Sequence, residues 1–311
     1  HNEQAMAHAA IAYAKAARRR QMMACTSSIG PGATNMVTAA AVAHANRLPV
    51  LFLPGDVHAS RRPDPVLQQV EDFEDGTISA NDCFRPVSRY FDRLTRPEQL
   101  LAALPRALCV LTDPALCGPV TLSLCQDVQT EAFDYPAAFF APRVWVPRRP
   151  RPDASELAAA VDALCKASKP LIIAGGGVHY AEAHEALAAF VERQQVPVAV
   201  TQAGKSALPD SHPLNLGAIG VTGTSAANAL AEQADVVLAI GTRLQDFTTG
   251  SRMLLRAPSC RLIGLNVQPF DASKHDALPL VADAGAGLEA LQAAMGSPKA
   301  RAGWRALAAM E

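Results

Sequence analysis

The sequence predicts an α/β protein with two doubly wound parallel-sheet domains, and three observations lead to this fold class. Short, continuous apolar runs alternate with longer segments whose apolar residues recur at helical spacing, as in βα units around a buried parallel sheet. This alternation is interrupted at residues 130–152, which are rich in proline, and then resumes. A length of 311 residues, half of them hydrophobic, is sufficient for two hydrophobic cores of ordinary size.

The chain opens with a predicted helix over residues 3–17. Asn2 is a suitable N-cap, and Glu3 in the first turn favours the helix dipole. A strand over residues 21–26 follows, and then a helix of small residues over 33–46. The next apolar run, Leu48 to Leu53, is short and continuous, which is typical of a parallel strand.

That strand leads into Pro54-Gly55-Asp56-Val57, at the edge of the sheet where open α/β folds bind ligands. Asp56 is therefore a candidate pocket residue, and a turn carboxylate or helix cap is the alternative interpretation. The irregular stretch that follows is expected to hold a short helix over 66–73 and a strand over 84–91. Leucines at helical spacing predict a helix over 96–110, and a further apolar run predicts a strand over 118–124.

Residues 131–152 are predicted to be an interdomain linker, because they combine many prolines with basic character. Aromatic and arginine residues there could also bind single-stranded nucleic acid, but the net charge of −1 argues against a polyanion partner or a membrane surface. The linker would separate a domain of residues 1–130 from a second domain of residues 153–296, which a tail of residues 297–311 follows.

The second domain repeats the alternation of helices and strands. Helices are predicted over 155–167, 181–193, 223–233 and 286–295, and strands over 169–174, 196–201, 235–240 and 261–266. Gly175-Gly176-Gly177 follows the first of these strands, as a dinucleotide fingerprint would. The fingerprint is incomplete, because Tyr180 replaces a glycine and Gln194 and Gln195 stand where its acidic residue is expected, so a structural turn is the better interpretation.

The segment between the first strand and the second helix is the candidate functional centre. Gly30 and Gly32 permit a tight turn and close backbone approach, and Pro31 between them fixes one dihedral angle. A strand, a glycine turn and a helix N-terminus together present N–H groups to a polar or anionic ligand. Taken alone, the same pattern also fits plain strand–helix geometry.

Together with the opening helix, this segment resembles the pyrimidine-binding domain of thiamine-diphosphate enzymes of the acetolactate-synthase type. The resemblance rests on His-Asn-Glu-Gln at the start of the chain and on Ser-Ile-Gly-Pro-Gly-Ala-Thr-Asn up to Asn35. In the second half it rests on Gly-Lys-Ser-Ala-Leu-Pro-Asp and Ala-Asp-Val-Val-Leu-Ala-Ile-Gly-Thr-Arg. It implies that Glu3 is catalytic and touches N1′ of the aminopyrimidine ring. The cofactor-binding residues that it implies are Gly30, Pro31, Gly32, Asn35 and Asp56.

The same resemblance implies a partial first domain, a central domain, and a third domain outside this sequence. Magnesium is expected with the cofactor, but the family's Gly-Asp-Gly motif for its ligands does not occur here, so no metal ligand is predicted. FAD, which acetolactate synthases bind in the central domain, is not expected, because the second arginine and one aspartate of its segment are lost after Arg243. We expect the chain to be a fragment, inactive alone, because it opens inside a motif and without Met.

Within the family, the sequence is similar to one branch in particular. The similarity is seen in residues 2–12 and 64–73 and in the extra residue of Ser27-Ser28-Ile29-Gly30. That branch hydrolyses a carbon–carbon bond of a cyclic 1,2-dione, a polyol-derived diketone of myo-inositol breakdown. An acetolactate-synthase-like carboligase and a non-catalytic nucleotide-binding α/β protein remain as alternatives. In this family the active site straddles a subunit interface, which implies a homodimer or homotetramer.

The location follows from the cysteines and from the absence of targeting patterns. The seven cysteines form no CxxC pair and several lie in apolar runs, so we expect buried thiols in a reducing cytoplasm. No apolar stretch reaches the ~20 residues of a membrane span, and no signal peptide is visible.

Overall fold

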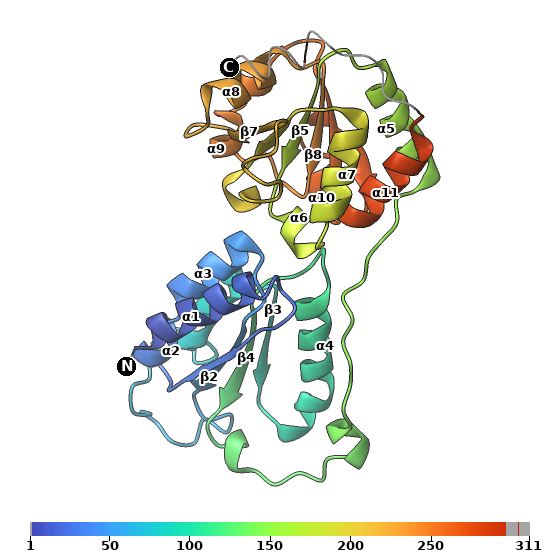
Figure 1. Ribbon diagram of the computed structural model, residues 1–311. Helices are drawn as coiled ribbons and strands as arrows, with labels where there is room; N and C mark the ends of the chain where they lie inside the picture. Colours follow the sequence, from blue (N-terminus) through green and yellow to red (C-terminus); the bar gives the residue numbers. More distant parts are fainter. Residues whose placement is uncertain (1, 297–303, 305–311) are drawn as a thin grey trace. The chain divides into compact units, whose positions relative to one another are not determined.

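The computed structural model describes residues 2–296 and residue 304, and the chain divides into two compact units between residues 148 and 149 (Figure 1). The predicted tail, residues 297–311, lies outside the described residues apart from Trp304, whose indole Nε1–H donates to the Pro170 carbonyl at 2.8 Å. Among the described residues, no helix combines the length and the apolar character needed to cross a bilayer.

The first unit is a parallel sheet of four strands in the order β1-β2-β4-β3. The strands are β1 (Ala24–Ser27), β2 (Leu51–Asp56), β3 (Tyr90–Leu94) and β4 (Val120–Cys125). The helices are α1 (Glu3–Ala16), α2 (Pro31–Thr34), α3 (Val37–Asn46) and α4 (Leu100–Thr112), with 3₁₀ helices η1 (Ala80–Val87), η2 (Pro97–Gln99), η3 (Val128–Thr130) and η4 (Ala137–Phe140).

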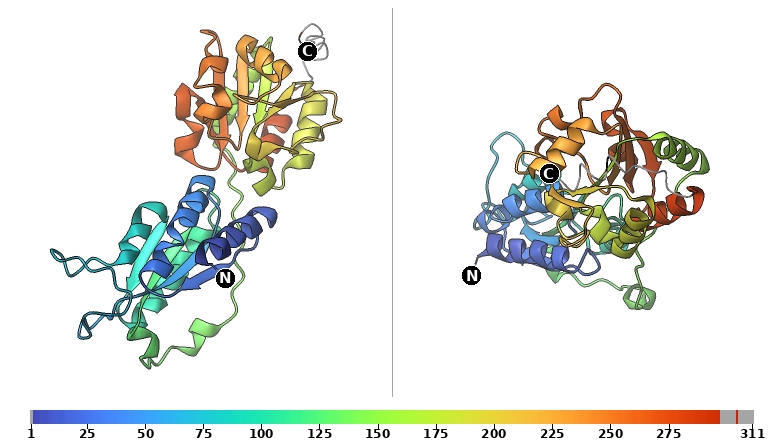
Figure 2. Two further views of the ribbon diagram at one scale, coloured as in Figure 1. Left: turned by 90° about the vertical axis from the view of Figure 1, so that its left-hand side faces the viewer. Right: turned by 45° about the horizontal axis from the view of Figure 1, so that its top comes forward.

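Helices cover both faces of this sheet. Figures 1 and 2 show α1 and α3 on one side and α4 on the other. The α4 side buries Leu94, Val120 and Leu122 against the helix. Leu51 of β2 packs against this same core. The next residue, Phe52, is completely buried and packs instead on Phe84 of η1, with ring centroids 5.8 Å apart. This alternation along a strand is what a sheet with two covered faces requires.

The second unit is a parallel sheet of six strands in the order β10-β9-β8-β5-β6-β7. The strands are β5 (Pro170–Ala174), β6 (Val198–Val200), β7 (Asn215–Ala218), β8 (Val236–Ile240), β9 (Arg261–Asn266) and β10 (Leu278–Val281). The helices are α5 (Ala154–Lys166), α6 (Gly177–Tyr180), α7 (His184–Gln194), α8 (Ser225–Gln233), α9 (Asp246–Thr249), α10 (Pro269–Ala272) and α11 (Ala284–Ala294), with 3₁₀ helices η5 (Gln202–Gly204), η6 (Met253–Leu255) and η7 (Lys274–Asp276).

Two hydrophobic cores lie on opposite faces of the second sheet. Ile172 and Ala174 of β5 belong to one core with α5, α7 and α11, whereas Leu171 and Ile173 belong to the other with α8. Both sheets are therefore buried on two faces, and the predicted fold class of two doubly wound parallel-sheet domains is confirmed.

Two elements predicted in the first unit are wrong. Residues 66–73 form no helix; instead the Asp72 carboxylate accepts from the backbone N–H groups of Glu74 and Asp75 and holds a turn. Residues 84–91 were predicted as one strand, but η1 extends to Val87 and β3 begins only at Tyr90. The cause is a capping box, in which Ser79 and Asp82 satisfy each other's backbone and start the 3₁₀ helix.

Other predictions need smaller corrections. The helix predicted over 33–46 is two helices, α2 and α3, interrupted at Asn35 and Met36. The strand predicted over 48–53 begins three residues later and ends at Asp56. The short strands β7 and β10 were not predicted, because β10 contains Pro279 and β7 contains Gly217, which both weaken a strand pattern.

The cysteine prediction holds for only part of the set. All seven thiols are free, and those of Cys25, Cys117 and Cys125 are buried, as predicted. Cys83, Cys109 and Cys165 are exposed, so the prediction of buried thiols is wrong for them. Each lies in a helix, and a single cysteine in a helical segment carries no sequence signal for the face on which it falls.

Candidate functional site

The first residue of α1 is Glu3, and the helix fixes its place. The side chain of Asn2 accepts a hydrogen bond from the Ala5 backbone N–H at 3.0 Å, as an N-cap does. Further along the helix, Ala7, Ala10, Ile11 and Ala14 are buried. The N-terminal turn of α1 is therefore anchored both by its cap and by the packing of the helix.

The glycine turn brings a second segment to Glu3. The Nδ2 of Asn35, at the end of α2, donates to Glu3 Oε2 at 2.8 Å. A Cβ atom placed on Gly32 would lie 3.0 Å from Ser28 Oγ and 3.6 Å from Glu3 Oε1. A side chain at position 32 would thus cover both oxygen atoms, and glycine leaves them uncovered on that side.

Gly30 is required by the turn itself. Its φ of +67° is a left-handed conformation, and an added Cβ would lie 1.8 Å from the carbonyl oxygen of Gln68. Pro31 opens α2, and its carbonyl accepts from the Asn35 backbone N–H at 3.0 Å. The structure therefore brings together Gly30, Pro31, Gly32 and Asn35, four of the five predicted cofactor-binding residues, beside Glu3.

A loop after β2 also contacts the glycine turn. Ser28 Oγ donates to Gln68 Oε1 at 3.3 Å, and the Gln68 backbone carbonyl lies over Gly30. We name residues 57–79 the β2 loop; Figure 2 shows it projecting from the first unit. Gln68 was not predicted as a site residue, because its place depends on a contact between segments 40 residues apart.

The hydrogen bond from Asn35 is the largest influence on the pKa of the Glu3 carboxyl. It lowers the pKa of the Glu3 carboxyl, since a donor to the charged form favours that form, and a hydrogen bond from the Glu3 backbone acts in the same direction. Desolvation raises the pKa, but by less. The pKa of the Glu3 carboxyl is therefore held below its usual value in this chain.

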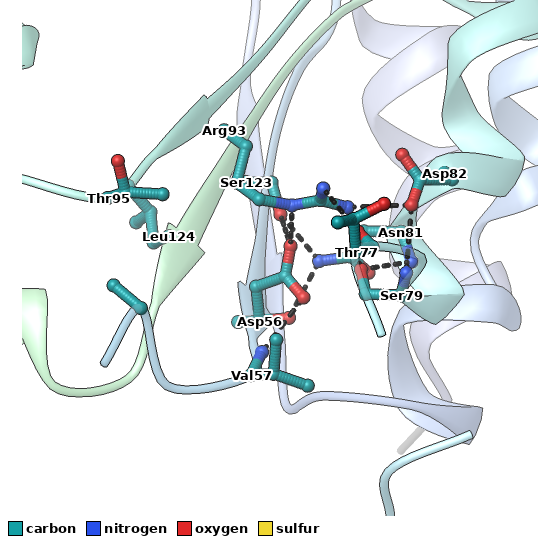
Figure 3. A network of polar contacts seen from close by, with 12 residues as sticks. Asp56, Val57, Thr77, Ser79, Asn81, Asp82, Arg93, Thr95, Ser123 and Leu124 are labelled. Atoms are coloured by element: carbon teal, nitrogen blue, oxygen red, sulfur yellow. Dashed lines mark hydrogen bonds and ion pairs between the residues drawn. The ribbon is translucent and has the colours of Figure 1, made fainter. Parts of the chain in front are cut away.

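The fifth predicted cofactor-binding residue, Asp56, is occupied within the fold (Figure 3). Its buried carboxylate accepts from Arg93 Nε at 2.8 Å, from the Ser123 hydroxyl and from the Val57 backbone N–H at 2.8 Å. The structure gives this side chain a structural role of the turn-carboxylate kind, and its role in cofactor binding stays a prediction.

The Asp56 contacts belong to a network that holds the C-terminal end of the β2 loop, at Ser79. Arg93 Nη2 also donates to Ser79 Oγ and to the Asp82 carboxylate, both at 2.8 Å (Figure 3). Burial lowers the pKa of Arg93, but the hydrogen bonds and negative charges of Asp82 and Asp56 outweigh it and raise that pKa. Asn81 adds hydrogen bonds to the Gly55 carbonyl and to Ser123 Oγ.

A second carboxylate holds the N-terminal end of the β2 loop. Asp127 accepts from the backbone N–H groups of Ala59 at 2.8 Å and Ser60 at 3.0 Å. The loop is thus fastened at both ends while its middle lies against the glycine turn. Polar residues inside the buried strand β4, Thr121 and Ser123, were the sequence signal that could have indicated a buried polar network.

The glycines of the second unit have a packing function. A Cβ on Gly175 would lie 2.6 Å from the Gly241 carbonyl oxygen, and one on Gly177 would lie 2.5 Å from the Gly241 Cα. The ends of β5 and β8 are in backbone contact there, which supports a structural turn. Within residues 2–296 and residue 304, no three His, Cys, Asp or Glu side chains cluster closely enough to hold a metal ion.

Comparisons with known proteins match both units. Residues 1–75 match the family described as thiamine pyrophosphate enzyme, N-terminal TPP binding domain, and residues 157–291 match thiamine pyrophosphate enzyme, central domain. A Geobacillus thermodenitrificans protein is 55% identical over 295 residues, 95% of this chain and 46% of that protein. Proteins of Bacillus cereus strain AH820 and Bacillus thuringiensis strain Al Hakam are each 54% identical, over 93% and 91% of this chain and 45% and 44% of their own lengths. All three are named 3D-(3,5/4)-trihydroxycyclohexane-1,2-dione hydrolase, and the chain spans about half their length.

Proposed function

The chain belongs to the thiamine pyrophosphate enzyme family, of which it holds the N-terminal TPP binding and central domains, and on this premise we propose that it is part of a hydrolase of cyclic 1,2-diones. The substrate is proposed to be a trihydroxycyclohexane-1,2-dione, as the names of the relatives indicate. Its place in myo-inositol breakdown is proposed from the resemblance of the sequence to that branch of the family. The structural observation that carries the proposal is the group of Glu3, Gly32 and Asn35, where a carboxylate is held beside a position without a side chain.

The residues of this group fit the aminopyrimidine end of thiamine diphosphate. Gly32 leaves Glu3 Oε1 and Ser28 Oγ uncovered on one side, so a flat ring can approach both oxygen atoms. Glu3 then offers Oε1 as the hydrogen-bonding partner of N1′, while Oε2 stays bound to Asn35. The turn at Gly30 and Pro31 starts α2, which carries Gly32 and ends at its C-cap Asn35.

When bound, thiamine diphosphate supplies a nucleophilic carbon that attacks a ketone and stores the negative charge released on carbon–carbon cleavage. The contribution of Glu3 would be to share a proton between Oε1 and the N1′ nitrogen of the bound cofactor, as a general acid–base group. Asn35 and the α1 N-terminus keep the carboxylate in place. The β2 loop contacts the glycine turn through Gln68, at Ser28 and Gly30.

Several further features are part of the proposal. Magnesium would be held by residues outside this chain, because the described residues offer no cluster of ligands and the sequence has no Gly-Asp-Gly. Asp56 would contribute to the cofactor site only indirectly, through the β2 loop. The complete protein is proposed to be a cytoplasmic homodimer or homotetramer that acts on a small diketone and binds neither nucleic acid nor a membrane.

The test of this function is Glu3→Gln in the full-length protein. The variant keeps the size of the side chain but cannot share a proton, so turnover of the cyclic dione should fall by roughly 10²- to 10⁴-fold. Glu98→Gln is the matched control, since Glu98 is also a first-turn glutamate but is exposed, in η2. Unchanged turnover in Glu3→Gln would exclude the role of Glu3, and condensation of the substrate in place of ring opening would favour the carboligase alternative.

A further inference from the structure

We propose that Asn35 is a positioning residue that acts on the reaction through Glu3, by fixing which of the two carboxylate oxygens meets the cofactor. This inference rests on the proposed function of Glu3, and it differs from the prediction that Asn35 binds the cofactor itself. Its basis is the 2.8 Å hydrogen bond from Asn35 Nδ2 to Glu3 Oε2.

Both partners of this hydrogen bond are held by their own backbone. Asn35 lies where α2 ends, and its N–H donates to the Pro31 carbonyl at 3.0 Å. Glu3 begins α1, whose first turn is capped by Asn2. The bond therefore joins two anchored segments that are 32 residues apart, and neither side chain can turn away without breaking it.

The chemistry of an amide gives the bond a direction. The NH₂ group of Asn35 is only a donor, so Oε2 must be an acceptor and cannot carry a proton directed at Asn35. The hydrogen bond therefore favours Oε1 as the oxygen that takes up a proton. That oxygen lies beside Gly32, 3.6 Å from the position that a Cβ atom would occupy. Asn35 thus divides the carboxylate into an anchored oxygen and a proton-sharing oxygen.

The hydrogen bond also keeps Glu3 ready as an acceptor. It is the largest cause of the lowered pKa of the Glu3 carboxyl, because it favours the ionised form. Without Asn35 the carboxyl would rotate more freely, and either oxygen could face the ring. Fewer molecules would then hold the productive geometry, which weakens catalysis without removing the acid itself.

A double-mutant cycle in the full-length protein tests whether Asn35 acts through Glu3. Asn35→Ala should lower kcat by roughly 10- to 100-fold, the range expected for a hydrogen bond to a charged group. In a Glu3→Gln background the same substitution should cost nothing further, because its target is already lost. Asn46→Ala is the matched control: its exposed amide donates to the Val42 carbonyl at 2.9 Å and should be neutral in both backgrounds.

Calorimetry with two probes separates positioning from direct binding. The probes are thiamine diphosphate and an analogue in which carbon replaces N1′, and their affinity ratio measures the contact between Glu3 and that nitrogen. Asn35→Ala and the isosteric Asn35→Asp should both reduce the ratio toward that of Glu3→Gln. Circular dichroism and the unfolding midpoint would establish that these variants are folded.

The outcomes distinguish a failure of the positioning role of Asn35 from a failure of the proposed function of Glu3. Equal losses of affinity for both probes in Asn35→Ala, or losses of kcat that add to those of Glu3→Gln, would show that Asn35 binds the cofactor directly and would overturn the positioning role. A ratio that Glu3→Gln itself leaves unchanged would overturn the proposed function of Glu3. A ratio that falls in Glu3→Gln but not in either Asn35 variant would overturn this inference alone.

Discussion

At the scale of single residues, Gly30 and Gly32 stand two positions apart and differ in what a side chain would meet. A Cβ on Gly30 would lie 1.8 Å from a backbone oxygen of the β2 loop, and the φ of +67° is unfavourable for any other residue. A Cβ on Gly32 would meet only side-chain atoms, and the nearest two are oxygen atoms, at 3.0 and 3.6 Å. The first glycine is therefore needed for folding, and the second keeps the site open.

Gly30→Ala should lower the free energy of unfolding by about 1–3 kcal/mol, because it combines backbone strain with a steric clash. Gly32→Ala should leave stability nearly unchanged, since Ser28 can rotate, but should weaken thiamine diphosphate binding in the full-length protein. Gly32→Val should weaken it further. Urea denaturation and calorimetry measure the two quantities. Equal cofactor affinity for wild type and Gly32→Val at equal stability would make Gly32 a structural turn only.

At the scale of elements, the Asp56–Arg93 ion pair ties β2 to β3 and to the start of η1. Arg93→Met should lower the free energy of unfolding of the first unit by about 3–5 kcal/mol, because Asp56 is left as a buried charge without its cation. Asp56→Asn combined with Arg93→Met should recover part of that loss. Denaturation of the single and double variants measures this coupling; a double variant no more stable than Arg93→Met would contradict it.

The Asp82 contacts with Ser79, Arg93 and Arg85 predict how the first unit responds to acid. Burial raises the pKa of Asp82, but hydrogen bonds from the Ser79 N–H and both arginines outweigh it and hold the pKa below its usual value. The stability from this group is complete above the unfolded pKa of about 3.9 and is lost as the pH falls through the lower folded value.

Asp82→Asn should therefore destabilise the first unit at pH 7 and make its stability less dependent on pH below about 4. Urea denaturation from pH 2.5 to 7 would show the change. Asp134→Asn, at an exposed position, serves as the control and should behave like wild type. An acid response of Asp82→Asn identical to that of wild type would mean that the carboxylate contributes no pH-dependent stability.

The elements that could be predicted from sequence are those with a local signal. The α1 and α5 helices were predictable because Asn2 and Asp153 cap them and their apolar residues are periodic. The η1 segment was not, because its geometry comes from a capping box inside an irregular stretch. In the site, one motif carries Gly30, Gly32 and Asn35 together, whereas Arg93 lies 37 residues from Asp56, and no local pattern indicates that pairing.

At the scale of the whole molecule, each of the two units has its own hydrophobic core. Residues 149–311, produced alone, should fold cooperatively, because both faces of the six-stranded sheet are buried within that unit. Their urea midpoint should match the corresponding transition of the 311-residue chain. Circular dichroism and denaturation curves measure this. A polypeptide of residues 149–311 without a cooperative transition would show that the second unit depends on the first.

The exposed cysteines have a practical consequence for spectroscopy. Cys109 on α4 and Cys165 on α5 are exposed thiols, one in each unit. After Cys83, the other exposed thiol, is replaced by serine, they provide natural attachment points for a donor and an acceptor fluorophore. Energy transfer between the two dyes would report the distance between the units in solution, and a titration with thiamine diphosphate would show whether the ligand alters that distance.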